Sequence, residues 1–259
     1  MLRAESVSFG YSGGFTLTDA TVTIAAGAVT GLLGPNGCGK TTLLKLLCGV
    51  LHPRSGRVMI GERTLASMTR RELARHVAVV PQETHPAFEY TVLEMVLMGR
   101  HPHLSAFQLE GPADFEIARQ ALDATGTGHL STRSYMTLSG GEKQRVVIAS
   151  ALAQATDILL LDEPTASLDL GYQLEIASLL ARLNVERRVT MVLATHDLNL
   201  AASLCKCVIV MRDGRILAAG ATDEVLTDQT VRRLYDVEAD VQFHSRAGHL
   251  TVVPIRRTL

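Results

Sequence analysis

The segment Val29-Thr30-Gly31-Leu32-Leu33-Gly34-Pro35-Asn36-Gly37-Cys38-Gly39-Lys40-Thr41-Thr42 decides the fold of this chain. Its first five residues form a short, uncharged and largely apolar run, which is typical of a strand buried on both faces. A glycine-rich turn follows, and the pattern from Thr41 to Val50 is helical. A strand, a glycine-rich turn and a helix in this order predict a phosphate-binding loop.

The chemistry of such a loop depends on residues that this segment contains. Gly34, Gly37 and Gly39 let backbone N–H groups point inward at phosphate oxygens, beside the N-terminus of the following helix. Lys40 brings a positive charge to the β- and γ-phosphates, and the Thr41 hydroxyl can ligate magnesium. The alternative is a glycine-rich turn with an incidental lysine, and the flanking strand and helix argue against it. We therefore expect a nucleotide-binding protein.

The rest of the chain alternates short apolar runs with helical patterns. Such alternation predicts an α/β fold in which helices cover a mostly parallel sheet. Further strands are expected at Val77–Val80, Ile158–Leu161, Val189–Ala194 and Val208–Met211. Each run is free of charge, as strands buried on both faces should be.

The region from about 83 to 136 has a different character. Three prolines interrupt it, and the segments Val92–Met98 and Asp114–Thr125 have helical patterns. We expect a helical subdomain here, inserted into a core formed by residues 1–82 and 137–236. The extension 237–259 alternates weakly around Gly248 and predicts a small hairpin. Together these parts are expected to form one domain of 259 residues.

The composition argues against some functions. A formal net charge of −1 offers no general attraction for nucleic acid, so no nucleic-acid partner is expected. No apolar run approaches the roughly 18 residues of a membrane-spanning helix, so a role in a membrane process would need another chain. The four cysteines lack the spacing of a zinc site, and we interpret them as reduced thiols. For Cys205 and Cys207, a metal pair is the alternative to small side chains at the start of a strand.

Two acids follow one of the expected strands. In Ile158-Leu159-Leu160-Leu161-Asp162-Glu163, Asp162 at the strand tip is placed to hold magnesium, directly or through water. Glu163 is placed to polarise an attacking water molecule. A strand that simply ends at Pro164, with two solvated acids, is the alternative. The phosphate-binding loop elsewhere in the chain favours the catalytic interpretation.

Single residues after two other strands are further candidates. Gln82 follows Val77–Val80, and its amide can reach the magnesium ion or the attacking water. His196 follows the strand that ends at Thr195 and is a candidate contact of the γ-phosphate. A lone glutamine is more often a surface residue, and a lone histidine a structural one. Their weight comes from position, because ligands bind at the carboxyl ends of strands in open α/β sheets.

The segment Leu138-Ser139-Gly140-Gly141-Glu142 begins what is expected to be a helix through Gln144 and Ala149. A serine hydroxyl and two glycine N–H groups at a helix N-terminus make a second phosphate-binding group. The alternative is an ordinary N-cap with Glu142 in the first turn. One loop already surrounds one triphosphate, so a second phosphate-binding group is unexplained within a single chain.

In combination and order, these motifs resemble those of the ATP-binding subunits of ABC transporters, over nearly the whole chain. The resemblance implies a P-loop NTPase core of the ABC ATPase type, with an inserted helical subdomain and an N-terminal antiparallel β part. Its segments are the Walker A loop at Gly34–Thr42, the Q-loop at Gln82, the signature at Leu138–Glu142, the Walker B strand at Leu159–Glu163, the D-loop at Ser167–Asp169 and the switch histidine at His196.

The resemblance also implies a role for each site residue. Tyr11 stacks on adenine, Glu163 is the catalytic glutamate, and Gln82 and His196 assist it. Magnesium is held by Thr41, Gln82 and Asp162. The implied nucleotide contacts are Tyr11, Gly34, Asn36, Gly37, Cys38, Gly39, Lys40, Thr41 and Thr42, together with Ser139, Gly140, Gly141 and Asp169.

Partners follow from the same resemblance. The cofactors are ATP and Mg²⁺, and ATP is hydrolysed to ADP and phosphate to drive transport across a membrane. Two copies of the chain pack head to tail, with each ATP between the loop of one copy and Ser139 of the other. That arrangement accounts for the second phosphate-binding group. Two permease subunits hold the dimer at the cytoplasmic face of the inner or plasma membrane, and a substrate-binding protein is an indirect partner.

A finer resemblance lies in the segment Thr91–His103, which is similar to that of ATPases serving importers of iron-siderophores, haem and cobalamin. This segment faces the permease, so it indicates the type of permease and only indirectly the cargo. An alternative is that His101 and His103 bind iron or haem, but the cargo does not need to contact this subunit. The alternative function is an ATPase of an exporter or lipoprotein-release complex. ABC-type ATPases of DNA repair are excluded, because the segment from Thr41 to Ser139 is too short for their coiled coil.

Overall fold

A six-stranded sheet runs through the middle of the molecule in the computed structural model, which describes residues 1–105 and 107–258. Its strands are all parallel except the edge strand Arg215–Ala221, which runs antiparallel to its neighbour. In spatial order they are β10 (Arg215–Ala221), β9 (Cys207–Arg212), β3 (Val29–Leu33), β8 (Thr190–Thr195), β7 (Ile158–Asp162) and β6 (Val77–Val80). The predicted mostly parallel sheet is confirmed, with each predicted strand within one residue of its observed bounds.

The central strands are buried because helices or a second sheet cover both faces. On β7, Leu160 packs toward helix α1 (Lys40–Leu47), while Leu159 and Leu161 pack into the cluster on the opposite face. Alternate side chains of a strand point to opposite faces, so a strand in this position must be apolar throughout. This is why the apolar runs in the sequence located the strands.

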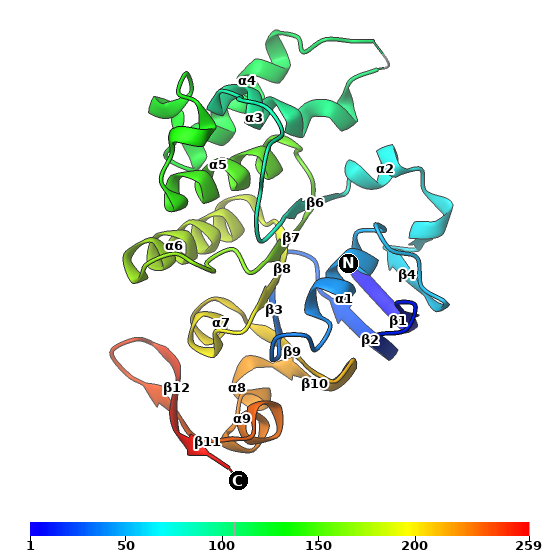
Figure 1. The fold of residues 1–259 in the computed structure, drawn as a ribbon, viewed down its shortest axis with the longest axis vertical. Coiled ribbons are helices and arrows are strands. Elements are labelled where there is room, and N and C mark those ends of the chain that lie inside the picture. The colour runs from blue at the N-terminus through cyan, green and yellow to red at the C-terminus, as the bar shows by residue number, and fades with distance from the viewer. Residues whose placement is uncertain (106, 259) are drawn as a thin grey trace.

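An antiparallel sheet lies over α1 and confirms the expected N-terminal β part (Figure 1). Its order is β2 (Thr16–Ile24), β1 (Leu2–Gly10), β4 (Ser55–Ile60) and β5 (Arg63–Thr64). The turn η1 (Leu65–Ser67) and the short helix α2 (Arg70–Ala74) then lead back to β6. The inner side chains of this sheet form one core with the leucines of α1.

Helices gather at the end of the molecule opposite the C-terminus (Figure 1). They are α3 (Val92–Leu97), η2 (Met98–His103), α4 (Pro112–Ala124) and α5 (Gly140–Ala153), with the short turns η3 (Gly128–Leu130) and η4 (Tyr135–Thr137). Helix α5 packs against both α3 and α4. The division of the chain at residues 83 and 136 stays a prediction.

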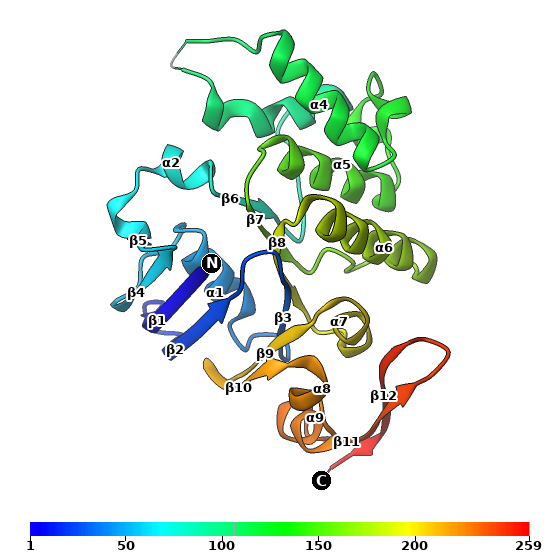
Figure 2. The ribbon, with the colours of Figure 1, turned by 180° about the vertical axis from the view of Figure 1, so that it is seen from behind.

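The other face of the central sheet is covered by α6 (Leu170–Arg187) and α7 (Leu198–Leu204), as the view from behind shows (Figure 2). Two short helices, α8 (Thr222–Val225) and α9 (Asp228–Tyr235), follow the sheet. The chain then forms the antiparallel hairpin of β11 (Val237–His244) and β12 (His249–Arg257), with Gly248 at a positive φ of 77° in the turn. Within residues 1–105 and 107–258, no helix is both long and apolar enough to cross a bilayer.

Candidate nucleotide-binding site

The glycine-rich loop lies between β3 and α1, and close packing requires its glycines. Gly39 precedes α1 at a φ of 109°, where a side chain would be strained, and a Cβ there would overlap the ring of Phe15. A Cβ at Gly34 would overlap the main-chain carbonyl of Met211 and the Cys38 sulfur. A side chain at either position would therefore force the loop out of this conformation.

Lys40, the first residue of α1, lies folded across this loop with only 5% of its side chain exposed. Its ammonium group donates to the carbonyls of Gly34 and Pro35, at 2.8 and 3.3 Å. The same group lies 3.4 Å from Glu163 Oε1. A buried ammonium held by these three oxygens is placed to meet an anion that enters the loop.

Asp162 ends β7 and is 8% exposed. Burial raises the pKa of its carboxyl, and the neighbouring Glu163 charge raises it further, while a hydrogen bond from Thr41 acts in the opposite direction. Its Oδ1 atom has no hydrogen-bond partner among the described residues. A buried, unpartnered carboxylate oxygen next to a threonine hydroxyl has the hard oxygen donors that Mg²⁺ prefers, so these residues fit that ion.

Glu163 has a backbone conformation that its sequence does not signal. Its φ is 47°, in the left-handed region that non-glycine residues rarely adopt, and its N–H donates to Ala194 O at 2.9 Å. The side chain then spans two segments, because Oε1 faces Lys40 and Oε2 lies 2.9 Å from Nδ1 of His196. Strained backbone of this kind concentrates at functional sites, where the rest of the fold holds it in place.

A cleft of about 430 Å³ opens at the loop. It is lined by Tyr11, Phe15, Asn36, Gly37, Gly39, Lys40, Thr41, Thr42, Gln82 and Glu163. The structure thus brings Gln82, after β6, together with the loop and Glu163. Tyr11 packs edge-on against Phe9 at the outer rim of this cleft. Phe15 was not predicted, and its only sequence signal is an aromatic residue after two glycines.

The segment at Ser139 does not line this cleft. The Ser139 hydroxyl caps α5, accepting from the Glu142 N–H at 3.3 Å and donating to Glu142 Oε2 at 2.9 Å. The backbone N–H of Ser139 also donates to that carboxylate, and this bond is the main cause of the lowered pKa of Glu142. The segment is therefore an N-cap in this chain, at a helix end whose first N–H groups have no acceptor within the helix.

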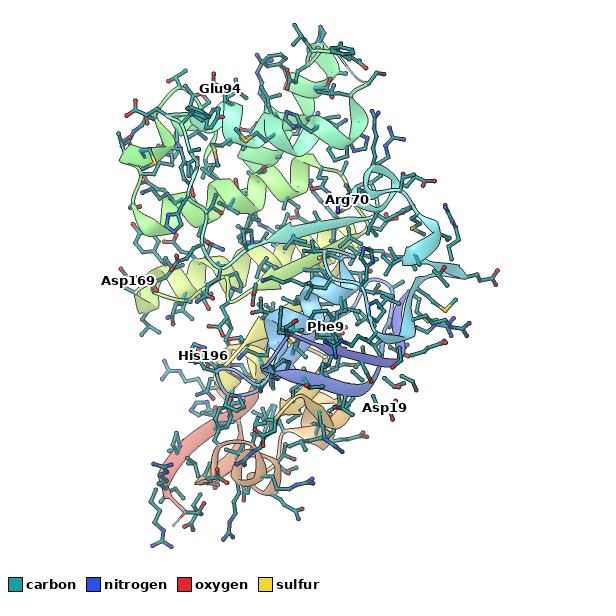
Figure 3. The ribbon with its side chains drawn as sticks, turned by 45° about the vertical axis from the view of Figure 1, so that its right-hand side comes forward. Phe9, Asp19, Arg70, Glu94, Asp169 and His196 are labelled. Atoms are coloured by element: carbon teal, nitrogen blue, oxygen red, sulfur yellow. The ribbon has the colours of Figure 1, made fainter. Side chains whose placement is uncertain are left out.

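Gly141 and Asp169 also lie away from the cleft. A Cβ at Gly141 would overlap the ring of Tyr172 on α6, so the N-terminus of α5 packs directly on that helix. Asp169 caps α6 by accepting from the Tyr172 N–H at 3.0 Å, and it lies at the outer edge of the molecule in Figure 3. The predicted site residues thus form two groups, one around the loop and one around Ser139.

The histidines of the 91–103 segment have local partners. His103 Nε2 donates to Gln154 O at 2.8 Å, and His101 Nε2 lies 3.8 Å from Glu110 Oε1. In the part of the chain that the structure describes, no group of three or more His, Cys, Asp or Glu side chains is arranged to hold a metal. The contacts of His103 bind the end of α5 to this segment.

The P-loop nucleotidases are a class of proteins that hold a triphosphate on a loop between a strand and a helix. A buried acid in these proteins serves the magnesium ion. The arrangement around Lys40 and Asp162 places this chain in that class. The chain belongs to the ABC transporter family, since residues 17–166 match the family model described as ABC transporter. It is an ATP-binding subunit of the kind that hydrolyses ATP to power transport.

Relatives match nearly the whole chain. The ferric enterobactin transport ATP-binding protein FepC of Escherichia coli is 38% identical, with 99% of this chain and 95% of the relative covered. The hemin import ATP-binding protein HmuV of Bordetella pertussis is 41% identical, with 97% and 98% covered.

Solved structures have the same fold. A structure described as an inward-facing conformation of a metal-chelate type ABC transporter has a TM-score of 0.87 at 30% identity, covering 98% of this chain and 96% of that one. A dimeric structure of a bacterial ABC transporter cassette has a TM-score of 0.74 at 28% identity, covering 86% and 99%.

Proposed function

We propose that this chain is the ATP-hydrolysing subunit of a membrane importer whose cargo is an iron-siderophore complex, haem or cobalamin. The main support is sequence identity: over nearly its full length, the chain is 38–41% identical to subunits named for ferric enterobactin transport and hemin import. A subunit named for cobalamin import in Halobacterium salinarum is 39% identical over 92% of this chain. These names favour an importer over an exporter or lipoprotein-release complex.

In the proposed reaction, the triphosphate lies on the loop backbone and Lys40 turns from the Glu163 carboxylate to the β- and γ-phosphates. The freed Glu163 carboxylate then orients a water molecule for in-line attack on the γ-phosphate. His196, hydrogen-bonded to the same carboxylate, fixes its direction. Thr41, Asp162 and Gln82 would hold Mg²⁺, which neutralises charge on the phosphates.

A second copy of the chain would complete each site. Ser139, Gly140, Gly141 and Asp169 do not line the cleft of their own chain, which supports the proposal that they meet the ATP bound by the partner. Two permease subunits would hold this dimer at the cytoplasmic face of the inner membrane. A substrate-binding protein would deliver the cargo on the other side.

The direct test of the catalytic role is Glu163→Gln. Removing a general base lowers the rate by about 10²–10⁴-fold, so turnover should nearly vanish while ATP still binds. Glu116→Gln, on the outer face of α4, is the matched control and should hydrolyse normally. Hydrolysis by Glu163→Gln near the wild-type rate would remove Glu163 from this role.

The cargo is tested separately. We expect the chain to co-purify with its permease and, after reconstitution, to drive ATP-dependent uptake of one labelled compound among a ferric siderophore, haem and cobalamin. Uptake of none of the three, with transport of another substrate, would reject the proposed cargo class and leave the ATPase assignment intact.

A further inference from the structure

The C-terminal hairpin contacts the segment that carries His196. We propose that Tyr235 and Asn199 are positioning residues, through which α9 and the hairpin hold the His196 backbone so that its side chain meets Glu163. The inference rests on the proposed role of His196. In Figure 3, His196 lies where the core meets the C-terminal strands.

The first contact comes from α9. Tyr235, the last residue of that helix, donates from its hydroxyl to the main-chain carbonyl of His196 at 3.3 Å. Burial raises the pKa of Tyr235, so the phenol keeps its proton for this bond. The end of α9 is itself fixed, because Arg212 of β9 donates twice to the Asp236 carboxylate, at 3.0 and 2.8 Å.

The second contact comes from the hairpin. The side-chain amide of Asn199, in the first turn of α7, donates to Val252 O at 3.2 Å and accepts from Val252 N at 2.7 Å. The amide thus pairs with β12 as a neighbouring strand would. Asn199 also donates its backbone N–H to Asp197 Oδ1 at 2.9 Å, so this contact fixes the helix start that directly follows His196.

Further contacts close these elements into a ring. Val252 pairs with Val241 across the hairpin, and the Val241 N–H donates to Asp228 Oδ1 at the start of α9, at 2.8 Å. Ala239 and Val252 are buried against the main core. The series of contacts therefore leads from His196 through α7 to β12, across to β11 and α9, and back to the His196 carbonyl.

This ring matters for His196 because its side chain is held by little else. The imidazole is 54% exposed, and within the described residues its one side-chain hydrogen bond is to Glu163 Oε2. Its place is therefore set mainly by its backbone, which these contacts hold at the His196 carbonyl and at the start of the helix that follows. Tyr235 and Asn199 do not line the cleft at the loop, so loosening them should affect the hydrolytic step and not ATP binding.

The test measures kcat and KM for ATP in the full-length chain, with kcat expressed per bound nucleotide so that unfolded protein does not count. Tyr235→Phe keeps the aromatic side chain in place and removes only its hydrogen bond to His196. We expect kcat to fall about two- to tenfold with KM unchanged. Asn199→Ala should act in the same way. The controls are Ser203→Ala on α7 and Gln242→Ala on the hairpin, whose side chains bond only locally, and both should keep wild-type values.

The His196→Ala background separates the possible outcomes. If the two residues act through His196, Tyr235→Phe should lower kcat no further in that background. A wild-type kcat for both Tyr235→Phe and Asn199→Ala, beside a low kcat for His196→Ala, overturns this inference and leaves the role of His196 standing. Normal hydrolysis by His196→Ala itself rejects the proposed role of His196 and the inference with it. Should Asn199→Ala fail to fold, Tyr235→Phe decides.

Discussion

The buried ion pair of Arg100 makes the most quantitative prediction about stability. Arg100 is 7% exposed and donates from Nε to Asp114 Oδ1 at 3.0 Å. It also donates from one terminal nitrogen to Ala153 O at 2.7 Å, at the end of α5. One guanidinium therefore joins η2 to α4 and α5.

Arg100→Ala would leave both acceptors without this donor. Breaking a buried ion pair from one side costs about 3–5 kcal/mol. The Asp114 carboxylate keeps the bond from the Gly111 N–H at 3.0 Å and is 14% exposed, which favours the low end of that range. We expect a loss of about 3 kcal/mol, or a fall in Tm of roughly 6–12 °C for a chain of this length.

The assay is thermal unfolding, with Arg145→Ala as the matched control. Arg145 also donates to a carboxylate, Glu175, at 2.7 Å, but both side chains of this pair are more exposed. A surface pair contributes about 0–1 kcal/mol, so the control should shift Tm by a few degrees at most. Equal shifts for the two variants would refute the argument that burial makes Arg100 the more important residue.

Three further predictions test the site. Asp162→Asn should raise the Tm of the nucleotide-free protein at pH 7. Folding raises the pKa of Asp162, so the stability of the wild-type protein falls as the pH rises from 3.8 through the folded-state pKa. The gain in Tm should therefore shrink toward pH 4, and a lower Tm at pH 7 would contradict this reasoning. Gly39→Ala should abolish ATP binding, as measured by calorimetry. Adding Phe15→Ala to this variant removes the overlapping ring but should not restore binding, since residue 39 still needs a positive φ. Tyr11→Ala should raise KM for ATP severalfold and leave kcat unchanged.

The sequence was most informative where local pattern and burial coincide. The run Ile158–Leu161 located β7 because a strand covered on both faces must be apolar at every position. Gln82 and Glu163 could be placed in one cleft because the carboxyl ends of parallel strands meet at the same edge of a sheet. These predictions needed no knowledge of long-range contacts.

Other features depend on contacts that leave no local pattern. Two examples are contacts between residues distant in the chain: the Phe15 ring beside Gly39, and the hydrogen bond from Tyr235 to His196. A third is the positive φ of Glu163, which strains a single residue. Ser139 is a different case, because a helix N-cap and a phosphate-binding group use the same hydroxyl and N–H groups. Neither the sequence nor one copy of the chain distinguishes these roles.

The most direct test of the shared site is the mass of Glu163→Gln protein in ATP, measured by analytical ultracentrifugation. We predict a dimer with ATP and a monomer without it. Adding Ser139→Arg should keep ATP binding and abolish the dimer, while adding Thr91→Ala, which removes the similar N-cap of α3, should leave the dimer intact. A Ser139→Arg protein that still dimerises with ATP would contradict the claim that each ATP lies between two copies of this chain.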